Sequence, residues 1–201
     1  MNPIKMGHLK HVVWYDLEEY GPILEPFCNY LVSPEGLKFT LDDDNEMENS
    51  KSGIRIDNVW NEDRPEIKLM SAIFDTAVIQ YLNNIHPRFK NSQRDYILKK
   101  DGWVTSIKTR QHVVKHTHVP PYVRQQDMGD VITIFYAFLD QTIGPDNGPL
   151  EFFNAEEDME PTLVWTPKRY ALVVMLPEIW HRAKPFKGKR YSLATDVQVI
   201  C

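Results

Sequence analysis

Residues 130–154 read "DVITIFYAFLDQTIGPDNGPLEFFN", and this stretch sets the class of the fold. Two runs rich in Ile, Phe, Tyr and Thr flank a segment of Gly, Pro, Asn and Asp, which predicts two short β-strands joined by a turn. The pattern returns downstream, without helical periodicity between the runs, in "PTLVWTP" (161–167), "YALVVMLP" (170–177) and "RYSLATDVQVI" (190–200). Short strands at regular spacing predict a β-sandwich or barrel.

Upstream of this stretch the sequence predicts helix as well as strand. The segment "RPEIKLMSAIFDTAVIQYLNNIH" (64–86) places apolar residues three and four apart, which predicts an amphipathic helix over about 65–86. Residues 1–40 mix short apolar runs with Pro and Gly, and they are compatible with a strand and a short helix. Residues 42–53 are polar and acidic, so we expect either a solvated surface loop or a mobile lid there.

The chain therefore combines a mixed N-terminal part with a β-rich C-terminal part. Residues 95–116 predict two short strands on either side of an Asp-Gly dipeptide at 101–102, because this dipeptide is common in turns. We expect one domain over residues 1–201, with a flanking region over 1–94 and a β core over 95–201.

The composition of the 201 residues, 42% of them hydrophobic, is typical of a globular domain with a core. The net charge of −5 and the lack of a basic stripe argue against a nucleic-acid partner. No run approaches the roughly 18 apolar residues of a membrane span, and the N-terminus has no apolar secretory segment, so we expect no membrane partner. Two distant cysteines, Cys28 and Cys201, indicate a reducing compartment, and we expect a cytoplasmic protein.

The run "VVKHTHVPP" (113–121) places two imidazoles at a predicted strand end. Because residues i and i+2 of a strand point to the same face, His116 and His118 share a face, and the proline pair ends the strand. His181, which follows another predicted strand, is the third candidate ligand. Three ligands on one face of an ion leave positions open for substrate and dioxygen, as in non-haem iron oxygenases. The alternative is that these are ordinary strand or core histidines.

A predicted strand that begins at Arg190, nine residues after His181, carries a second group of polar residues. Arg190, Ser192 and Ala194 share one face of this strand. An inward guanidinium is costly to bury unless it meets an anion, and its planar fork suits a carboxylate. This face therefore indicates a pocket for a small dicarboxylate. The alternative is that Arg190 is a surface charge in the basic run "KGKR" (187–190).

These motifs resemble those of the Fe(II)/2-oxoglutarate-dependent oxygenases, especially the prolyl-hydroxylase-like branch, over about residues 110–200. That family has a His-x-Asp at a strand end, two strands joined by a Gly-containing turn, a later strand that delivers the distal His, and an Arg further on. The corresponding segments here are "KHTH", "DVITIFYAFLD", "DNGPLEFF", "VVMLPEIWH" and "KPFKGKRYS". The resemblance implies an α+β, mainly β fold: a double-stranded β-helix, that is, a cupin-like jelly-roll, with flanking N-terminal helices.

One position departs from the family pattern, because His118 stands where the family has its carboxylate ligand. Three interpretations follow. His116, His118 and His181 form a three-histidine site, or a carboxylate from elsewhere (Asp127 or Glu151) completes the site, or the site binds no metal. The spacing favours the first. The resemblance implies Fe(II), while an all-histidine site makes Zn, Ni or Co more competitive.

The resemblance also implies 2-oxoglutarate as a small-molecule cosubstrate, with its distal carboxylate on Arg190 and Ser192. The tyrosine that contacts this carboxylate in the family falls near Phe138, which cannot donate a hydrogen bond, and we expect Tyr136 on the same strand face. Candidate residues for the rim of the substrate site are Trp103, Tyr122, Arg124 and Trp180.

The implied function is that of a dioxygenase that hydroxylates a protein side chain or a free amino acid. Two rival functions remain. The first is a cupin-type metal dioxygenase that does not use 2-oxoglutarate, in which Arg190 binds the substrate's own carboxylate. The second is a metal-free jelly-roll binding module.

Overall fold

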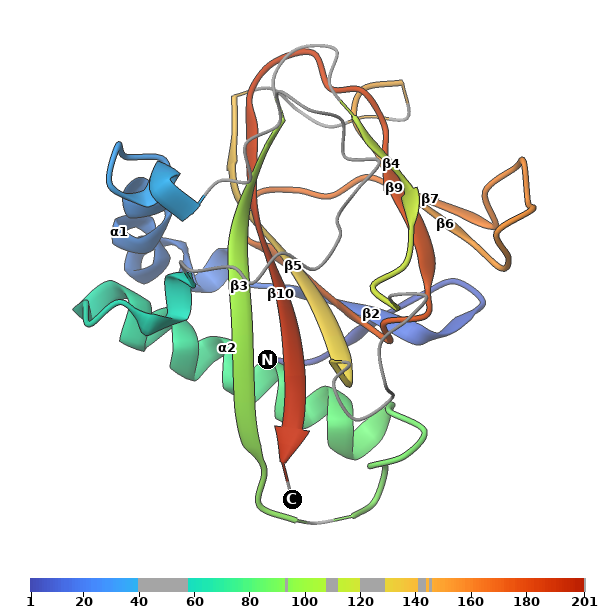
Figure 1. The fold of residues 1–201 in the computed structure, drawn as a ribbon, viewed down its shortest axis with the longest axis horizontal. Coiled ribbons are helices and arrows are strands. Elements are labelled where there is room, and N and C mark those ends of the chain that lie inside the picture. Colours follow the sequence, from blue (N-terminus) through green and yellow to red (C-terminus); the bar gives the residue numbers. More distant parts are fainter. Residues whose placement is uncertain are drawn as a thin grey trace.

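The computed structural model describes residues 1–39, 58–92, 94–107, 112–119, 129–140, 144 and 146–200. Within them the protein is mainly β, as the sequence predicts: two antiparallel sheets face each other, and two α-helices cover the outer face of the larger sheet (Figure 1). The acidic stretch 42–53 lies outside the described residues. None of the described helices is long and apolar enough to cross a membrane.

The larger sheet has six strands in the spatial order β1-β2-β8-β5-β10-β3. Their bounds are Ile4–Met6 (β1), Leu9–Asp16 (β2), Ala171–Met175 (β8), Val131–Leu139 (β5), Arg190–Ile200 (β10) and Ile97–Ile107 (β3). The smaller sheet has four strands in the order β4-β9-β6-β7. Their bounds are Val113–His116 (β4), Trp180–Ala183 (β9), Leu150–Phe153 (β6) and Leu163–Trp165 (β7). From β3 onward the chain passes repeatedly between the two sheets, as in a jelly-roll.

β3 runs without interruption through the dipeptide at 101–102, so the turn predicted there is wrong. Gly102 allows a close approach instead, because a Cβ at this position would clash with the indole of Trp60. The indole N–H of Trp60 donates to Thr195 Oγ1 on the neighbouring strand at 3.1 Å, which fixes the ring over the glycine. A glycine inside a strand here marks the packing of a side chain against the backbone.

The helix predicted over about 65–86 is confirmed as α2 (Pro65–Asn84), and α1 (Gly21–Leu31) precedes it. Pro65 stands in the first turn of α2, where a missing N–H leaves no hydrogen bond unmade. Both helices bury their apolar faces, which include Phe27 and Phe74, against the outer face of the larger sheet. The described residues also form the short 3-10 helices η1 (Glu18–Tyr20), η2 (Gly36–Phe39) and η4 (Val59–Asn61).

The N-terminal region contributes strands as well as helices. β2 pairs with β8, so β1 and β2 extend the larger sheet. Tyr15 of β2 is fully buried and donates its hydroxyl to Ala77 O of α2 at 2.8 Å, which joins the helix to the sheet. The region expected to flank the β core over 1–94 therefore shares a sheet with that core.

A second apolar cluster fills the space between the two sheets. The larger sheet contributes Ile132, Val173 and Met175, and the smaller sheet contributes Leu150 and Phe152, all of them buried. Because side chains alternate along a strand, the opposite face of the larger sheet remains free to pack against the helices. Polar side chains of β4, β9 and β10 line one part of this interior, and they form the candidate site.

Candidate metal centre

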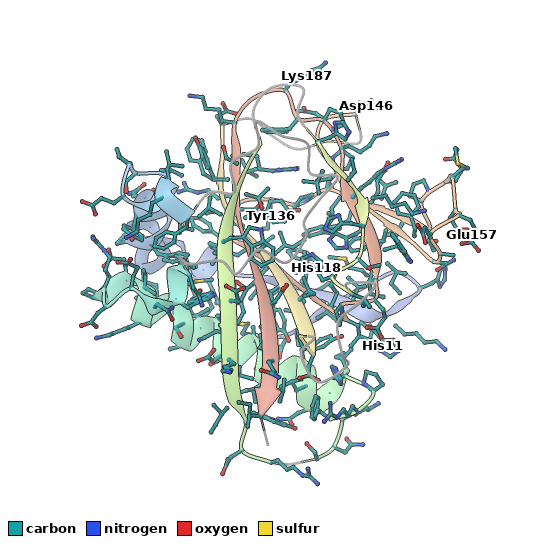
Figure 2. The ribbon with its side chains drawn as sticks, viewed as in Figure 1. His11, His118, Tyr136, Asp146, Glu157 and Lys187 are labelled. Atoms are coloured by element: carbon teal, nitrogen blue, oxygen red, sulfur yellow. The ribbon has the colours of Figure 1, made fainter. Side chains whose placement is uncertain are left out.

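Three histidines meet at one end of the smaller sheet. His116 ends β4, His181 lies in β9, and the two are direct partners in the antiparallel register. His118 follows two residues after His116, and its backbone N–H donates to Pro177 O at 2.9 Å. This bond holds the segment after β4 against the turn before β9, and His118 lies in the interior between the two sheets (Figure 2).

The three imidazole rings are close neighbours. Their centroids lie 4.4 Å apart for His116 and His181, 5.2 Å for His116 and His118, and 5.4 Å for His118 and His181. One ring nitrogen from each histidine belongs to a group in which all three atoms lie within 4.8 Å of one another. His181 is buried and the other two are half-buried. The structure thus brings together the three histidines that the sequence singles out.

Each ring has its Nδ1 beside an oxygen acceptor. His116 Nδ1 lies 2.8 Å from Val114 O, His181 Nδ1 lies 2.9 Å from Ile179 O, and His118 Nδ1 lies 2.9 Å from an oxygen of Asp196. An Nδ1–H that donates to these oxygens leaves the lone pair on Nε2, which is how histidine ligands are usually oriented towards a metal. The donor set therefore fits a divalent transition metal.

Burial keeps two of these imidazoles neutral. It lowers the pKa of His116 to about 4, and the nearby His118 acts in the same direction. Burial also lowers the pKa of His181 well below its ordinary value, again with the help of the other two imidazoles. Both rings are unprotonated at pH 7, which is the form that binds a metal ion.

Arg190, the first residue of β10, is only 1% exposed. Its Nη1 donates to Gly148 O at 2.8 Å, while its Nε is buried without a hydrogen-bond partner. Burial lowers the pKa of this guanidinium, and no carboxylate of the described residues forms an ion pair with it. Because a buried, unpaired cation is costly, these surroundings fit an anion.

Two hydroxyl side chains lie near this guanidinium. Ser192 is buried on the same face of β10, and Tyr136 of β5 is its partner in the β5–β10 register. The Tyr136 ring lies 6.0 Å from the Arg190 guanidinium. Burial raises the pKa of Tyr136 to about 12, although Arg190 acts in the opposite direction, so the hydroxyl stays protonated and can donate. These groups offer hydrogen-bond donors of the kind that bind a carboxylate.

Phe138 does not share the face of Tyr136, which corrects the sequence expectation. The β5–β10 register shifts between Tyr191 and Ser192, so one strand carries an extra residue there. Phe138 consequently pairs with Tyr191, and their rings lie 5.9 Å apart. Tyr191 lies between Arg190 and Ser192 in sequence and points to the opposite face. Phe138 is therefore not placed beside the guanidinium.

The structure places one of the two carboxylates that the sequence offers as alternative metal ligands. Glu151 of β6 is the cross-strand partner of Arg182 and forms an ion pair with its guanidinium, and Lys184 Nζ lies 3.8 Å away. The next residue, Phe152, is the one opposite His181, so Glu151 points to the other face of the sheet. Asp127 lies outside the described residues.

Asp196 is the residue of the site that the sequence analysis missed. It follows Arg190, Ser192 and Ala194 at every second position of β10, so the period of the strand could have included it. Its partner His118 is 78 residues away, and no local pattern connects the two.

Of the residues expected at the rim of the substrate site, the structure places one beside the histidines and one away from them. Trp103, almost fully buried, has its ring 5.9 Å from that of His118 and lies beside the site. Trp180 precedes His181 in β9 and faces Lys115, whose Nζ lies 5.8 Å from its ring, so it points away from the histidines. Tyr122 and Arg124 lie outside the described residues.

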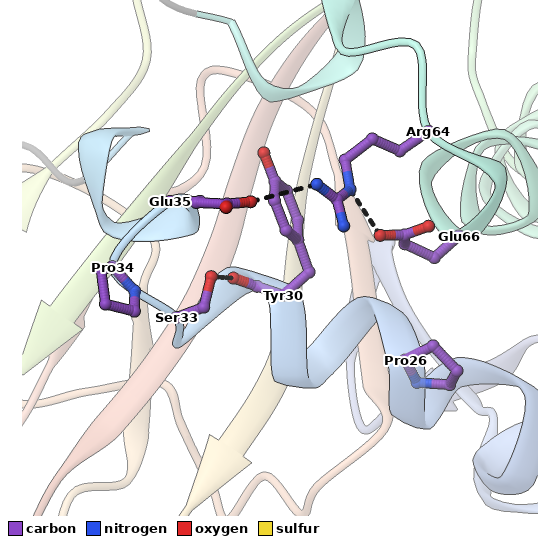
Figure 3. A pocket seen from close by; sticks show the side chains of 7 residues that line it. All are labelled: Pro26, Tyr30, Ser33, Pro34, Glu35, Arg64 and Glu66. Carbon is purple, nitrogen blue, oxygen red and sulfur yellow. Dashed lines mark hydrogen bonds and ion pairs between the residues drawn. The ribbon is translucent and has the colours of Figure 1, made fainter.

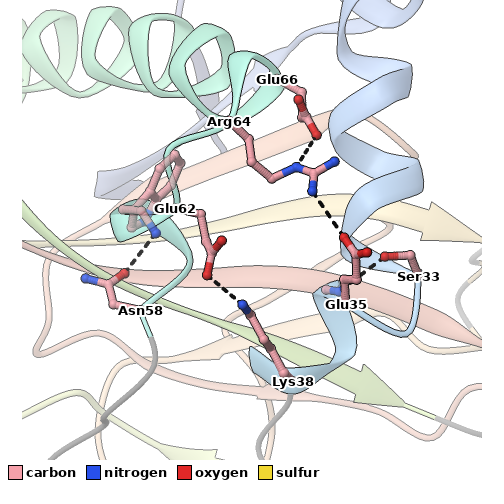
Figure 4. A network of polar contacts seen from close by, with 9 residues as sticks. Ser33, Glu35, Lys38, Asn58, Glu62, Arg64 and Glu66 are labelled. Atoms are coloured by element: carbon pink, nitrogen blue, oxygen red, sulfur yellow. Dashed lines mark hydrogen bonds and ion pairs between the residues drawn. The ribbon is translucent and has the colours of Figure 1, made fainter.

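A surface hollow lies between α1 and the start of α2, on other elements than the histidines (Figure 3). The Arg64 guanidinium lies 4.3 Å from the Tyr30 ring and pairs with Glu35 at 3.1 Å and Glu66 at 2.6 Å. Figure 4 shows that these pairs belong to a wider network of polar contacts. Because Arg64 already has two carboxylate partners, the hollow does not indicate an anion site.

Comparison with solved structures finds proteins of similar fold. AviO1 from Streptomyces viridochromogenes is similar at a TM-score of 0.55 and 14% identity, over 94% of this chain and 89% of that chain. IDO from Bacillus thuringiensis is similar at a TM-score of 0.53 and 16% identity, over 94% and 90% of the two chains. A prolyl-4-hydroxylase from Pseudomonas putida gives a TM-score of 0.48 and 17% identity, over 71% and 70%.

These similarities concern the fold alone, because the identities are low. The first two each extend over 94% of this chain. No protein-family model matches the chain, and no curated protein sequence matches it.

Proposed function

We propose that this protein is a non-haem Fe(II) dioxygenase that uses 2-oxoglutarate to hydroxylate its substrate. Two features of one sandwich carry the proposal. Three imidazoles offer nitrogens within 4.8 Å of one another, and a buried guanidinium has no carboxylate partner among the described residues. A cation site and an anion site between the same two sheets fit a metal ion and a dicarboxylate cosubstrate.

The strand order supports a double-stranded β-helix as the scaffold. Strands β3 to β10 make two four-stranded layers, β3-β10-β5-β8 and β4-β9-β6-β7. The histidines belong to the second layer and Arg190 to the first. The metal and the cosubstrate would therefore lie between the layers, where the apolar cluster excludes water.

Each polar side chain has a definite task in this proposal. The three histidines bind the metal through Nε2. Arg190 pairs with the distal carboxylate of 2-oxoglutarate, and the hydroxyls of Ser192 and Tyr136 donate to the same carboxylate. With both groups bound, the site supplies oxidative decarboxylation of the keto acid coupled to hydroxylation of a C–H bond.

The ligand set favours a second candidate, a cupin-type metal dioxygenase that does not use 2-oxoglutarate. His118 offers an imidazole where prolyl hydroxylases have a carboxylate, so the described donor set contains histidines alone. In this case Arg190 pairs with a carboxylate of the substrate itself. The two candidates share the metal and differ in the molecule that meets the guanidinium.

The proposed substrate is a protein side chain or a free amino acid, by analogy of fold. We also propose that nucleic acid is not a partner, because the net charge of the chain is −5. We propose the cytoplasm as its compartment, because its two cysteines are far apart in the sequence.

Anaerobic titration tests the proposal directly. Fe(II) followed by 2-oxoglutarate should give a weak visible charge-transfer band, and admission of oxygen should release succinate. Arg190→Ala should keep Fe(II) binding and lose the band, because it removes the partner of the distal carboxylate. His181→Ala should lose Fe(II) binding as well.

The other outcomes separate the alternatives. Oxygen consumption with Fe(II), without the band and without succinate, would support the second candidate. Absence of Fe(II) binding would contradict both and leave a metal-free binding module. Metal binding that survives His118→Ala and is lost in Asp127→Ala would replace His118 by a carboxylate ligand.

A further inference from the structure

Asp196 contacts a candidate ligand from across the sandwich. Its Oδ1 lies 2.9 Å from His118 Nδ1, while the other two histidines have backbone carbonyls at this position. Asp196 lies in β10 of the larger sheet, and His118 follows β4 of the smaller sheet. This bond therefore joins the two layers at the metal site.

We propose that Asp196 is a positioning residue that gives the three-histidine site its negative charge through His118, an inference that rests on the proposed function. A carboxylate hydrogen-bonded to a ligand imidazole fixes its tautomer and raises the basicity of its other nitrogen. Three neutral imidazoles do not offset any of the charge of a divalent ion. Asp196 supplies a negative charge that does not bind the metal directly but is hydrogen-bonded to His118, one of its ligands.

The same geometry accounts for the histidine at position 118. In His118→Asp, a carboxylate oxygen would lie near the present position of Nδ1, which is 2.9 Å from an oxygen of Asp196. Two carboxylates at such a distance repel each other, and one of them must take up a proton. Positions 118 and 196 thus depend on each other. Where the prolyl-hydroxylase pattern has a carboxylate that binds the metal, this chain has a histidine ligand whose hydrogen-bond partner is a carboxylate.

The surroundings distinguish this contact from an ordinary surface ion pair. The His118 side chain is 11% exposed and that of Asp196 is 35% exposed. The His118 ring also stacks against Trp103, with 5.9 Å between centroids and 30° between planes. His118 is held on one side by an indole and at Nδ1 by a carboxylate, so its orientation is fixed by both.

Co(II) binding tests the role of Asp196 independently of turnover. Affinity is measured by calorimetry and by the visible spectrum of bound Co(II) in the full-length protein. We expect Asp196→Asn to weaken binding about 10-fold and Asp196→Ala, which also removes the acceptor, by up to about 100-fold. Asp101→Asn is the matched control, because Asp101 is the cross-strand partner of Asp196 in β3 and its neutralisation removes the same charge from the same sheet. It should weaken binding less.

A second background gives the sharper test. In His118→Asp, Asp196→Asn should strengthen Co(II) binding, because it removes the repulsion and the new amide can donate to the new carboxylate. The effect of the same substitution thus changes sign between the two backgrounds. A general structural role of Asp196 would weaken binding in both.

The outcomes separate this inference from the proposed function. A wild-type protein that binds no Co(II) overturns the proposed function. Binding by wild type that neither Asp196→Asn nor Asp196→Ala weakens, in variants with the circular dichroism of the folded protein, overturns the role of Asp196 alone. A loss of affinity from Asp196→Asn in both backgrounds also overturns it.

Discussion

Arg190 is fully buried at the start of β10, where its one hydrogen bond to another described residue goes to Gly148 O and its Nε has no partner. In the absence of an anion the fold must bear the cost of this desolvated charge. We expect Arg190→Met to raise the free energy of unfolding, measured in urea without cosubstrate, by about 1 kcal/mol or more. The same variant should lose 2-oxoglutarate binding.

Arg182 provides the matched control, with an effect of opposite sign. Its guanidinium pairs with Glu151, whose side chain is 7% exposed. Arg182→Met leaves this carboxylate with Lys184 as its remaining cation, at 3.8 Å, so we expect it to lower the free energy of unfolding. An Arg190→Met variant that is also less stable than wild type would contradict an anion site at Arg190.

At the residue scale, the sequence predicts which side chains share a face when they all belong to one strand. The spacing of His116 and His118 places both on one face, and the same period links Arg190 to Ser192. The contact between His118 and Asp196 could not be predicted, because it depends on how two sheets are packed. Periodicity specifies the face of a strand but not which strand of the other sheet lies opposite.

At the scale of elements, the sequence failed where a strand departs from ideal pairing. β5 reads "VITIFYAFL", a nearly continuous apolar run, so its two faces cannot be distinguished by alternation. The register shift opposite Tyr191 and Ser192 then moves Phe138 to the other face. A bulge cannot be recognised in a continuous apolar run, and for this reason the face predicted for Phe138 is wrong.

The turn predicted at residues 101–102 is wrong for a related reason. The Asp-Gly pair, which is common in turns, lies inside strand β3. Gly102 is required by the Trp60 indole, which comes from a segment about forty residues earlier. We expect Gly102→Ala to lower the free energy of unfolding by about 1–3 kcal/mol, since the added methyl group has no space. Denaturation in urea measures the change.

Gly144→Ala is the control for this prediction, because nothing lies within 4 Å of the Cβ that it would add. It should leave the stability close to that of wild type. Metal affinity should be unchanged in both variants, since neither position contacts the histidines. If Gly102→Ala were as stable as Gly144→Ala, the strand would have another way to accommodate the indole.

At the scale of the whole molecule, the site depends on both layers of the sandwich. The smaller sheet provides the three histidines, and the larger sheet provides Arg190 and Asp196. Among the described residues, the layers are joined here by the hydrogen bond from Arg190 to Gly148 O, just before β6, and by the one between His118 and Asp196. Binding of a metal and a dicarboxylate should therefore stabilise the assembled sandwich as a unit.

Thermal unfolding measures this linkage between binding and folding. A metal ion present at about 100 times its Kd adds about 2.7 kcal/mol to the stability of a protein that binds it only when folded. For a chain of this size that corresponds to a rise in Tm of about 5–10 °C. We expect this rise for wild type with Co(II) under anaerobic conditions, and a further rise when 2-oxoglutarate is added. Arg190→Ala should keep the first rise and lose the second, while His181→Ala should lose both. A rise with Co(II) that persists in His181→Ala would place the metal elsewhere in the chain.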